Sequence, residues 1–228
     1  MVLCRPERRN TLDRQAVDAL REAFAEGGAG PVLLTAEGPA FCAGGDLRML
    51  QGSAESGELA AMMCANAAGF ADVIEAIVAS PRPVVAAVDG PAVGGGASLV
   101  LACDATIATP RALLAFAWGR YGLPPDGCVT ATLAAAVGAE RAQTLLDEGA
   151  EIAAGSEFAP QVFARVVPVE RLEEESLAAA ASAAKRAKAA EVLAEIRRRR
   201  GEELAAIAAA VADPAVVTRL AMIYKIDR

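Results

Sequence analysis

The fold is decided by the stretch Pro83-Val-Val-Ala-Ala-Val-Asp-Gly-Pro-Ala-Val-Gly-Gly-Gly-Ala-Ser98. It opens with the apolar run 84–88, which predicts a fully buried strand. After the turn at 89–91, three glycines lead into the apolar stretch 97–102, which predicts the start of a helix. A strand that passes through glycines into a helix leaves backbone N–H groups unpaired at the helix N-terminus. Such groups can bind an anion, or an oxygen that becomes anionic during a reaction.

A second glycine-rich stretch, Phe41-Cys-Ala-Gly-Gly-Asp-Leu47, follows the apolar run 31–36 in the same way. It is expected to end in a helix start, with Asp46 as the N-cap or a residue of the first turn. Taken alone, the triplet 94–96 is a weak signal, because it matches neither G-x-G-x-x-G nor a P-loop and a tight turn also explains it. Two strand–glycine–helix units, however, can each offer one N–H to the same oxygen.

The composition excludes several kinds of site. Of the 228 residues, 54% are hydrophobic, which is enough for one domain with a large core. The net charge of −7 argues against nucleic acid as the main partner. The chain has no histidine, which excludes Ser-His-Asp and Cys-His catalysis within it and removes the commonest zinc ligand. We therefore expect no metal site.

Cysteine usage and hydropathy bear on the compartment. The five cysteines are scattered without a C-x-x-C pair, which is typical of reduced thiols in the cytosol. We find no signal peptide and no apolar run of the ~18 residues that a membrane span needs. These observations predict a cytoplasmic protein.

Apolar periodicity predicts further elements along the chain. Helices are expected at 13–26, 59–79, 129–136 and 140–146, strands at 104–108 and 113–116, and a loop at 119–127. We interpret 51–58 as a mobile loop beside the site. Strands that alternate with helices indicate an α/β fold of stacked β–β–α turns rather than a sandwich.

Everything from Val169 onward is expected to be helical. The apolar stripes of these helices are too many for one small domain, which indicates packing on another subunit. We therefore divide the chain into a core, 1–168, and a C-terminal helical region, 169–228. The basic run Arg197–Arg200 is expected to be a solvated helix face, with a phosphate contact as the alternative.

Four blocks of this sequence resemble the crotonase (enoyl-CoA hydratase/isomerase) family. In chain order they are Arg5-Pro-Glu-Arg-Arg-Asn-Thr-Leu12, Phe41 to Leu47, Pro83 to Gly96, and Ala102-Cys-Asp104. The resemblance implies a crotonase-like spiral of ββα units whose C-terminal helices build trimers, often paired into hexamers. It also implies an acyl thioester substrate, attached to coenzyme A or to a carrier protein, with no separate cofactor.

The resemblance further implies the parts of an active site. The backbone N–H groups of Ala43 and Gly95 would hold the thioester oxygen and stabilise an enolate. Asp126 and Trp118 complete the catalytic set. The residues expected to contact the substrate are Cys42, Gly44, Asp46, Leu47, Gly94, Gly96, Ser98 and Tyr121.

The sequence departs from the family at two catalytic positions. Hydratases of the family use two glutamates, and this chain has Ser98 and Trp118 at the corresponding positions. Hydration needs a base for the water and an acid for the carbon, so this pair does not favour it. Asp126, eight positions after Trp118, remains. An aspartate at this position resembles the base of dienoyl-CoA isomerases and, with the tryptophan, the nucleophile of 4-chlorobenzoyl-CoA dehalogenases, which also use a histidine.

We therefore expect an enzyme of fatty acid or polyketide metabolism that stabilises a thioester enolate, with double-bond isomerisation by Asp126 favoured. Hydrolytic, dehalogenase-like or decarboxylative chemistry through Asp126 and Trp118 is one alternative. A non-catalytic acyl-CoA-binding paralogue or partner subunit is another. At the residue level, Asp126 as an N-cap of the helix near Val129 and Trp118 as a packing residue also stay open.

Overall fold

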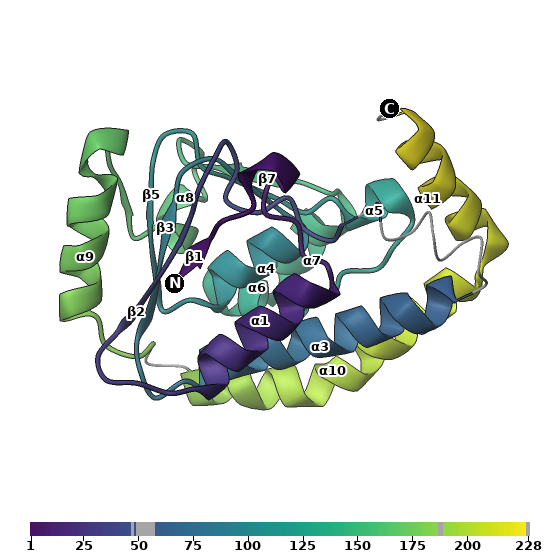
Figure 1. Cartoon of the computed structure of the whole chain (residues 1–228), viewed down its shortest axis with the longest axis horizontal. Helices are drawn as coiled ribbons and strands as arrows, with labels where there is room; N and C mark the ends of the chain where they lie inside the picture. The colour runs from purple at the N-terminus through teal and green to yellow at the C-terminus, as the bar shows by residue number, and fades with distance from the viewer. Residues whose placement is uncertain (47, 49–57, 187–188, 227–228) are drawn as a thin grey trace.

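The computed structural model describes residues 1–46, 48, 58–186 and 189–226 (Figure 1). Its larger sheet has five parallel strands in the order β1-β2-β3-β5-β8, and a smaller sheet has the order β4-β6-β7. The strand bounds are β1 Val2–Leu3, β2 Val32–Ala36, β3 Val84–Val88, β4 Pro91–Val93, β5 Ala105–Ala108, β6 Leu113–Ala115, β7 Glu151–Ala153 and β8 Arg165–Val166. Strands and helices alternate along the chain, so the predicted α/β class is confirmed.

The helices agree closely with the apolar periodicity. Their bounds are α1 Arg14–Ala25, α3 Leu59–Ala79, α4 Gly95–Ala102, α5 Trp118–Tyr121, α6 Val129–Val137, α7 Ala139–Asp147, α8 Ala159–Val162, α9 Leu172–Ser182, α10 Ala189–Ala212 and α11 Pro214–Ile226. Among the short elements that were not expected, β4 lies inside the first glycine stretch, and α5 begins in the residue before the predicted loop 119–127. Both are too short for a periodic pattern to reveal.

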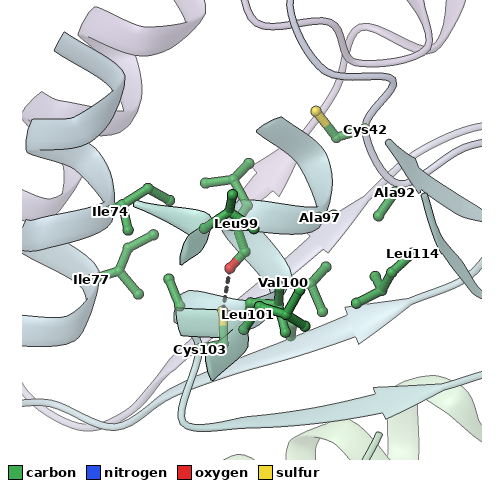
Figure 2. Packing of buried hydrophobic residues seen from close by; sticks show 14 of the residues in the cluster. Cys42, Ile74, Ile77, Ala92, Ala97, Leu99, Val100, Leu101, Cys103 and Leu114 are labelled. Atoms are coloured by element: carbon green, nitrogen blue, oxygen red, sulfur yellow. Dashed lines mark hydrogen bonds between the residues drawn. The ribbon is translucent and has the colours of Figure 1, made fainter. Parts of the chain in front are cut away.

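The centre of the core is the unit β3–β4–α4. All five residues of β3 and all eight of α4 are buried. Figure 2 shows the side chains of α4 packed against Ile74 and Ile77 of α3, with the Cys103 thiol donating to the Leu99 carbonyl oxygen at 3.3 Å. Burying each such aliphatic side chain contributes roughly 1.5–3 kcal/mol. The glycine-rich turn is therefore fixed by a buried strand before it and by a buried helix that begins at Gly95.

Helix α3 corrects one expectation from the sequence. Its 21 residues are long and apolar enough to cross a membrane by length and composition, although no such run was expected. In the structure its apolar side chains, among them Phe70, Val73 and Ile74, belong to the core. Its Asp72 and Glu75 form ion pairs with α10. Packing against the rest of the chain thus uses part of its apolar surface.

The C-terminal helices also correct an expectation. Helix α9 packs on β2, β3 and β5, α10 runs alongside α3, and α11 approaches α5 at the other end of the molecule (Figure 1). The apolar stripes that were expected to pack on another subunit are thus partly buried within this chain. Val192 and Ile196 of α10 join the main hydrophobic cluster. The division at residue 168 and the assembly into oligomers stay predictions.

The basic run on α10 is not simply a solvated face. Arg197 donates to Glu75 of α3 at 2.7 Å. Arg200 pairs with Asp72 and Glu75 and donates to the Ala68 carbonyl oxygen. Because an arginine can donate several hydrogen bonds in a fixed fork, one side chain ties the two helices together at three points.

Candidate active site

The two glycine-rich turns lie in direct contact. The N–H of Val93 donates to the Cys42 carbonyl oxygen at 2.9 Å, which joins the turn after β2 to β4. A Cβ on Gly96 would lie 2.2 Å from that same oxygen. A Cβ on Gly44, where φ is +82°, would lie 2.6 Å from the Val93 oxygen and 3.4 Å from the Gly95 nitrogen. These positions take glycine because backbone packs on backbone.

The N–H of Ala43 does not have the role expected of it. It donates to the Arg9 carbonyl oxygen at 2.9 Å, so it is already paired. The prediction was wrong only about which peptide of the turn has an unpaired N–H group. Spacing along the chain brings the right turn to the right place, but it does not say which way each peptide plane is rotated.

Gly45 provides the free N–H in this turn. It forms a parallel bridge with Leu12, in which the Leu12 N–H donates to Gly44 and the Asp46 N–H donates to Leu12. In such a bridge the N–H of the middle residue points away from the partner strand. No described residue accepts a hydrogen bond from the Gly45 N–H.

Gly95 provides a second free N–H. It is the first residue of α4, after the N-cap Gly94 with φ +52°, and its N–H also has no acceptor among the described residues. The first N–H groups of a helix have no partner inside it. Gly45 and Gly95 line the same cavity.

The cavity has a volume of about 140 Å³ and a mainly apolar wall. Helix α3 supplies much of the wall, and α10 closes part of it with Ile207. The described lining residues are Leu12, Ala43, Gly44, Gly45, Asp46, Met62, Met63, Asn66, Ala67, Phe70, Val93, Gly94, Gly95, Ala117, Trp118, Tyr121, Leu123, Asp126 and Ile207.

Most of the residues expected at the site do line this cavity. Cys42, Gly96 and Ser98 do not: they are buried directly behind its wall. The expected contact through Leu47 and the interpretation of 51–58 as a mobile loop concern positions outside the described residues, apart from Glu58 at the start of α3.

Asp126 and Trp118 form the polar centre of the cavity. The Trp118 indole N–H donates to Asp126 Oδ1 at 2.8 Å. Burial raises the pKa of Asp126 to about 6, although the indole hydrogen bond lowers it, and the nearby Glu203 adds to the rise. Trp118 is also packed in the core, so it has both a packing and a polar role. A carboxyl with such a pKa can exchange protons near neutral pH.

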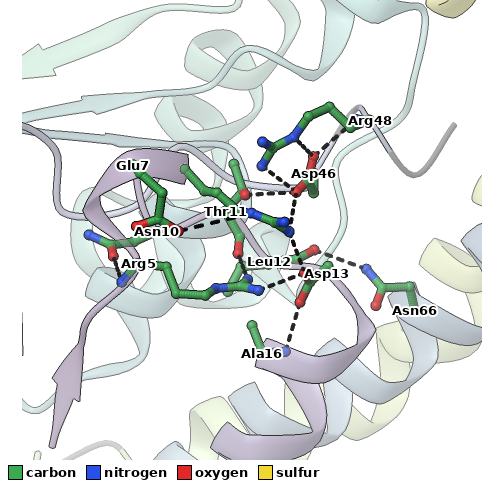
Figure 3. A network of polar contacts seen from close by, with 11 residues as sticks. Arg5, Glu7, Asn10, Thr11, Leu12, Asp13, Ala16, Asp46, Arg48 and Asn66 are labelled. Atoms are coloured by element: carbon green, nitrogen blue, oxygen red, sulfur yellow. Dashed lines mark hydrogen bonds and ion pairs between the residues drawn. The ribbon is translucent and has the colours of Figure 1, made fainter. Parts of the chain in front are cut away.

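Asp46, the other aspartate in the described wall, is held by a polar network (Figure 3). Its carboxylate accepts hydrogen bonds from Thr11 and from the backbone and guanidinium of Arg48. Burial alone would raise the pKa of Asp46, but these donors outweigh burial and hold it below its usual value. Asp46 therefore remains charged and fixes the Gly45 turn. The helix start expected after it falls on residues that the structure does not describe.

The turn that carries Asp126 is held from behind by two residues. The Ser98 hydroxyl donates to the Asp126 carbonyl oxygen at 3.3 Å. Glu203 of α10 accepts from the Cys128 N–H at 2.9 Å and from the Thr130 hydroxyl. Glu203 thus caps α6, and the interpretation of Asp126 as that cap is wrong, because its side chain bonds Trp118 instead.

Sequence reasoning missed Gly45 and Glu203. A signal for Glu203 was present: it falls on the same helical stripe as Ile196, Ile207 and Val211, all of which are buried. A lone acid on an apolar stripe is rarely buried without a partner. Its partners lie far away in the sequence, and the pattern of residues along one helix does not show which distant residues they are.

Several known proteins are similar to this chain in sequence. The family profile described as "Enoyl-CoA hydratase/isomerase" matches residues 1–220. "Probable enoyl-CoA hydratase echA6" of Mycobacterium tuberculosis is 39% identical over 151 residues, which cover 63% of this chain and 56% of the relative. "4-chlorobenzoyl coenzyme A dehalogenase-2" of an Arthrobacter species is 33% identical over 146 residues, covering 62% and 52%. The matched regions thus span little more than half of these relatives.

Solved structures match over almost the whole chain. An enoyl-CoA hydratase from Mycobacterium avium subsp. paratuberculosis superimposes with a TM-score of 0.79 at 26% identity, covering 96% of this chain and 92% of that one. An enoyl-CoA hydratase from Bacillus halodurans, at 22% identity, superimposes with a TM-score of 0.81 over 95% and 92%, which shows a shared fold.

Proposed function

Because the chain belongs to the enoyl-CoA hydratase/isomerase (crotonase) family, we propose that it acts on an acyl thioester, of coenzyme A or a carrier protein, through an enolate. One observation carries the proposal: the free N–H groups of Gly45 and Gly95 and the carboxyl of Asp126 share one largely apolar cavity. Two N–H donors aimed at the thioester oxygen stabilise the charge that develops when a neighbouring carbon loses a proton, and one such donor is typically worth ~10²–10³ in rate.

The favoured reaction is double-bond isomerisation with Asp126 as the base. Asp126 removes a proton from the acyl chain, the two N–H groups stabilise the enolate oxygen, and Asp126 returns the proton to a different carbon. The raised pKa of Asp126 suits both steps, since the group must accept and release a proton near neutral pH. The Trp118 indole orients the carboxyl.

Relatives carry the name hydratase, but hydration requires more catalytic groups than the described wall of this cavity provides. It requires a base for the water and an acid for the carbon. Among the described residues of the wall, the carboxyl groups are Asp46 and Asp126, and the ion-paired Asp46 stays ionised. Isomerisation needs one carboxyl that moves one proton, so it fits this wall better.

A second candidate is nucleophilic chemistry by Asp126. It is favoured by the hydrogen bond from Trp118 and by the similarity to a protein named 4-chlorobenzoyl coenzyme A dehalogenase. The absence of histidine from the chain counts against it, because another group would have to activate the attacking water.

Proton exchange in deuterated water tests the favoured reaction. A panel of saturated and unsaturated acyl-CoA thioesters should exchange protons next to the carbonyl or at the γ carbon, with a rate that rises with pH through about 6. Asp126→Asn should reduce this rate by ~10²–10⁴. Asp147→Asn, at an exposed position on α7, is the matched control and should not change it.

The other outcomes are equally informative. Exchange that survives Asp126→Asn unchanged would mean that another group is the base. Thioesters that bind without any exchange would favour a binding subunit without catalysis. Halide release from 4-chlorobenzoyl-CoA without exchange would favour the nucleophilic alternative.

A further inference from the structure

We propose that Glu203 is a positioning residue for Asp126, which makes the C-terminal helix α10 part of the active site. Glu203 is buried, with 9% of its surface exposed, and it lies far from Asp126 in the chain. The inference rests on the proposed role of Asp126 and deepens it, since it names what holds that carboxyl in place.

The geometry shows how Glu203 acts on the turn. One carboxylate oxygen accepts from the N–H of Cys128, two residues after Asp126, and the other accepts from the Thr130 hydroxyl. Cys128 has φ +57°, a left-handed conformation that is uncommon for a residue with a side chain. The hydrogen bond to its N–H helps to hold this conformation, which turns Asp126 toward Trp118.

A helix cap alone does not require this residue. A serine, threonine, aspartate or asparagine at the N-cap would satisfy the first N–H groups of α6 locally, whereas Cys128 forms no side-chain cap. The cap comes instead from a buried charge on another helix, which is costly unless it is well paired. That charge lies close enough to Asp126 to help raise its pKa.

The ionisable groups around Glu203 come from three parts of the structure. Asp126 and the Cys128 thiol lie on the turn, Arg199 lies on α10, and Glu75 of α3 faces the Cys128 thiol together with Arg200. Glu75 and Arg200 already pair with each other. Burial raises the pKa of Glu203, against the hydrogen bonds from Thr130 and Cys128.

Trp118 provides a direct test that needs no substrate. It is the only tryptophan in the chain, and its indole N–H donates to Asp126, so its ¹H–¹⁵N signal should follow the ionisation of that carboxyl. In the wild type the midpoint should lie at about 6, and Asp126→Asn should abolish the titration. Glu203→Gln keeps the shape of the side chain and one hydrogen-bond acceptor but removes the negative charge. It should lower the midpoint by a measurable part of the rise from 3.8 to about 6, because repulsion from Glu203 contributes to that rise.

Glu202→Gln is the matched control, because Glu202 precedes Glu203 on α10 and is exposed. It should leave the midpoint unchanged. Should Glu203→Gln fail to fold, Glu203→Asp keeps the charge but withdraws it by one methylene, and it should lower the midpoint by less. An unchanged midpoint in the folded variant, whatever happens to its melting temperature, would overturn the proposal and leave Glu203 a helix cap only. A wild-type indole signal that does not titrate would overturn it as well.

Thioester exchange separates this proposal from the proposed function. With an active enzyme, the acid limb of the exchange rate should move to lower pH in Glu203→Gln, in step with the indole midpoint. If no thioester exchanges protons but the midpoint still moves, the proposed reaction is wrong and the link between Glu203 and Asp126 stands.

Discussion

At the scale of single residues, the ionisation of Asp126 links activity to stability. Its pKa lies at about 6 in the folded protein, against an ordinary value of 3.8 that we take for the unfolded chain. The native state therefore holds the proton more tightly than the unfolded state does. Stability from this group is complete below pH 3.8 and is lost as the pH rises through 6. The charged base required for proton abstraction is thus a destabilising group.

Asp126→Asn should therefore stabilise the protein while it removes the base. The gain in the free energy of unfolding should be near zero at acid pH and about 3 kcal/mol above neutrality, because the two pKa values differ by about two units. Urea unfolding at several pH values measures it, with Asp147→Asn as the exposed control. A gain that does not depend on pH would show that the carboxyl is not desolvated in the native state.

The paired glycines of the second turn give another prediction. In Gly44→Ala the new Cβ meets the Val93 oxygen at 2.6 Å and φ is +82°, so the free energy of unfolding should fall by ~1–3 kcal/mol. Gly45→Ala keeps its N–H, and no described atom lies within 4 Å of the new Cβ, so both stability and thioester binding should be retained. Urea unfolding and acyl-CoA titration compare the two, and equal losses of stability would contradict the tight contact between the turns.

These residues also show how far the sequence could predict the site. The resemblance to the dehalogenases paired Trp118 with Asp126, and the structure joins the two side chains by a direct hydrogen bond. The choice of Ala43 was wrong, because the direction of its N–H depends on pairing with Arg9 and that of Gly45 on pairing with Leu12. Local sequence specifies a turn, whereas remote strand-like pairing orients its peptides.

At the scale of elements, the arginines of the basic run differ in how they take part in the contact between α3 and α10. Arg200 is 27% exposed and bonds Asp72, Glu75 and a backbone carbonyl. Arg198 is 56% exposed and pairs with Glu195 on its own helix. The basic run was expected to be solvated because a helical pattern cannot show which face meets a distant partner.

Arg200→Ala should lower the free energy of unfolding by about 1 kcal/mol, after allowance for solvent screening at the more exposed Asp72. Arg198→Ala, two positions earlier in the same run, should produce no measurable change because an exposed pair within one helix contributes little. Chemical denaturation of both variants at one protein concentration measures the difference. Equal effects of the two variants would mean that the hydrogen bonds of Arg200 do not stabilise the packing of α10 on α3.

At the scale of the whole molecule, the question is whether 169–228 folds as a separate unit. The sequence suggested a division at residue 168 because the helices that follow have apolar faces of their own. The structure places Ile196 of α10, which is fully buried, in the same hydrophobic cluster as Val84 and Leu99. The cavity wall likewise includes Ile207. A core shared in this way favours a single cooperative unit.

Ile196→Ala should therefore destabilise the whole chain by ~2–5 kcal/mol, as expected when a buried isoleucine is truncated in a packed core. Two probes report on different regions: the fluorescence of Trp118 follows the first part of the chain, and far-ultraviolet circular dichroism follows all helices, including α9 to α11. If the core is shared, the two urea transitions should coincide in the wild type and move together in the variant. If part of the helix signal is lost at a lower urea concentration than the Trp118 transition, 169–228 unfolds independently. Helix α10 would then unfold before the rest of the core. Leu177→Ala, at an exposed position on α9, is the control and should leave both transitions where they are.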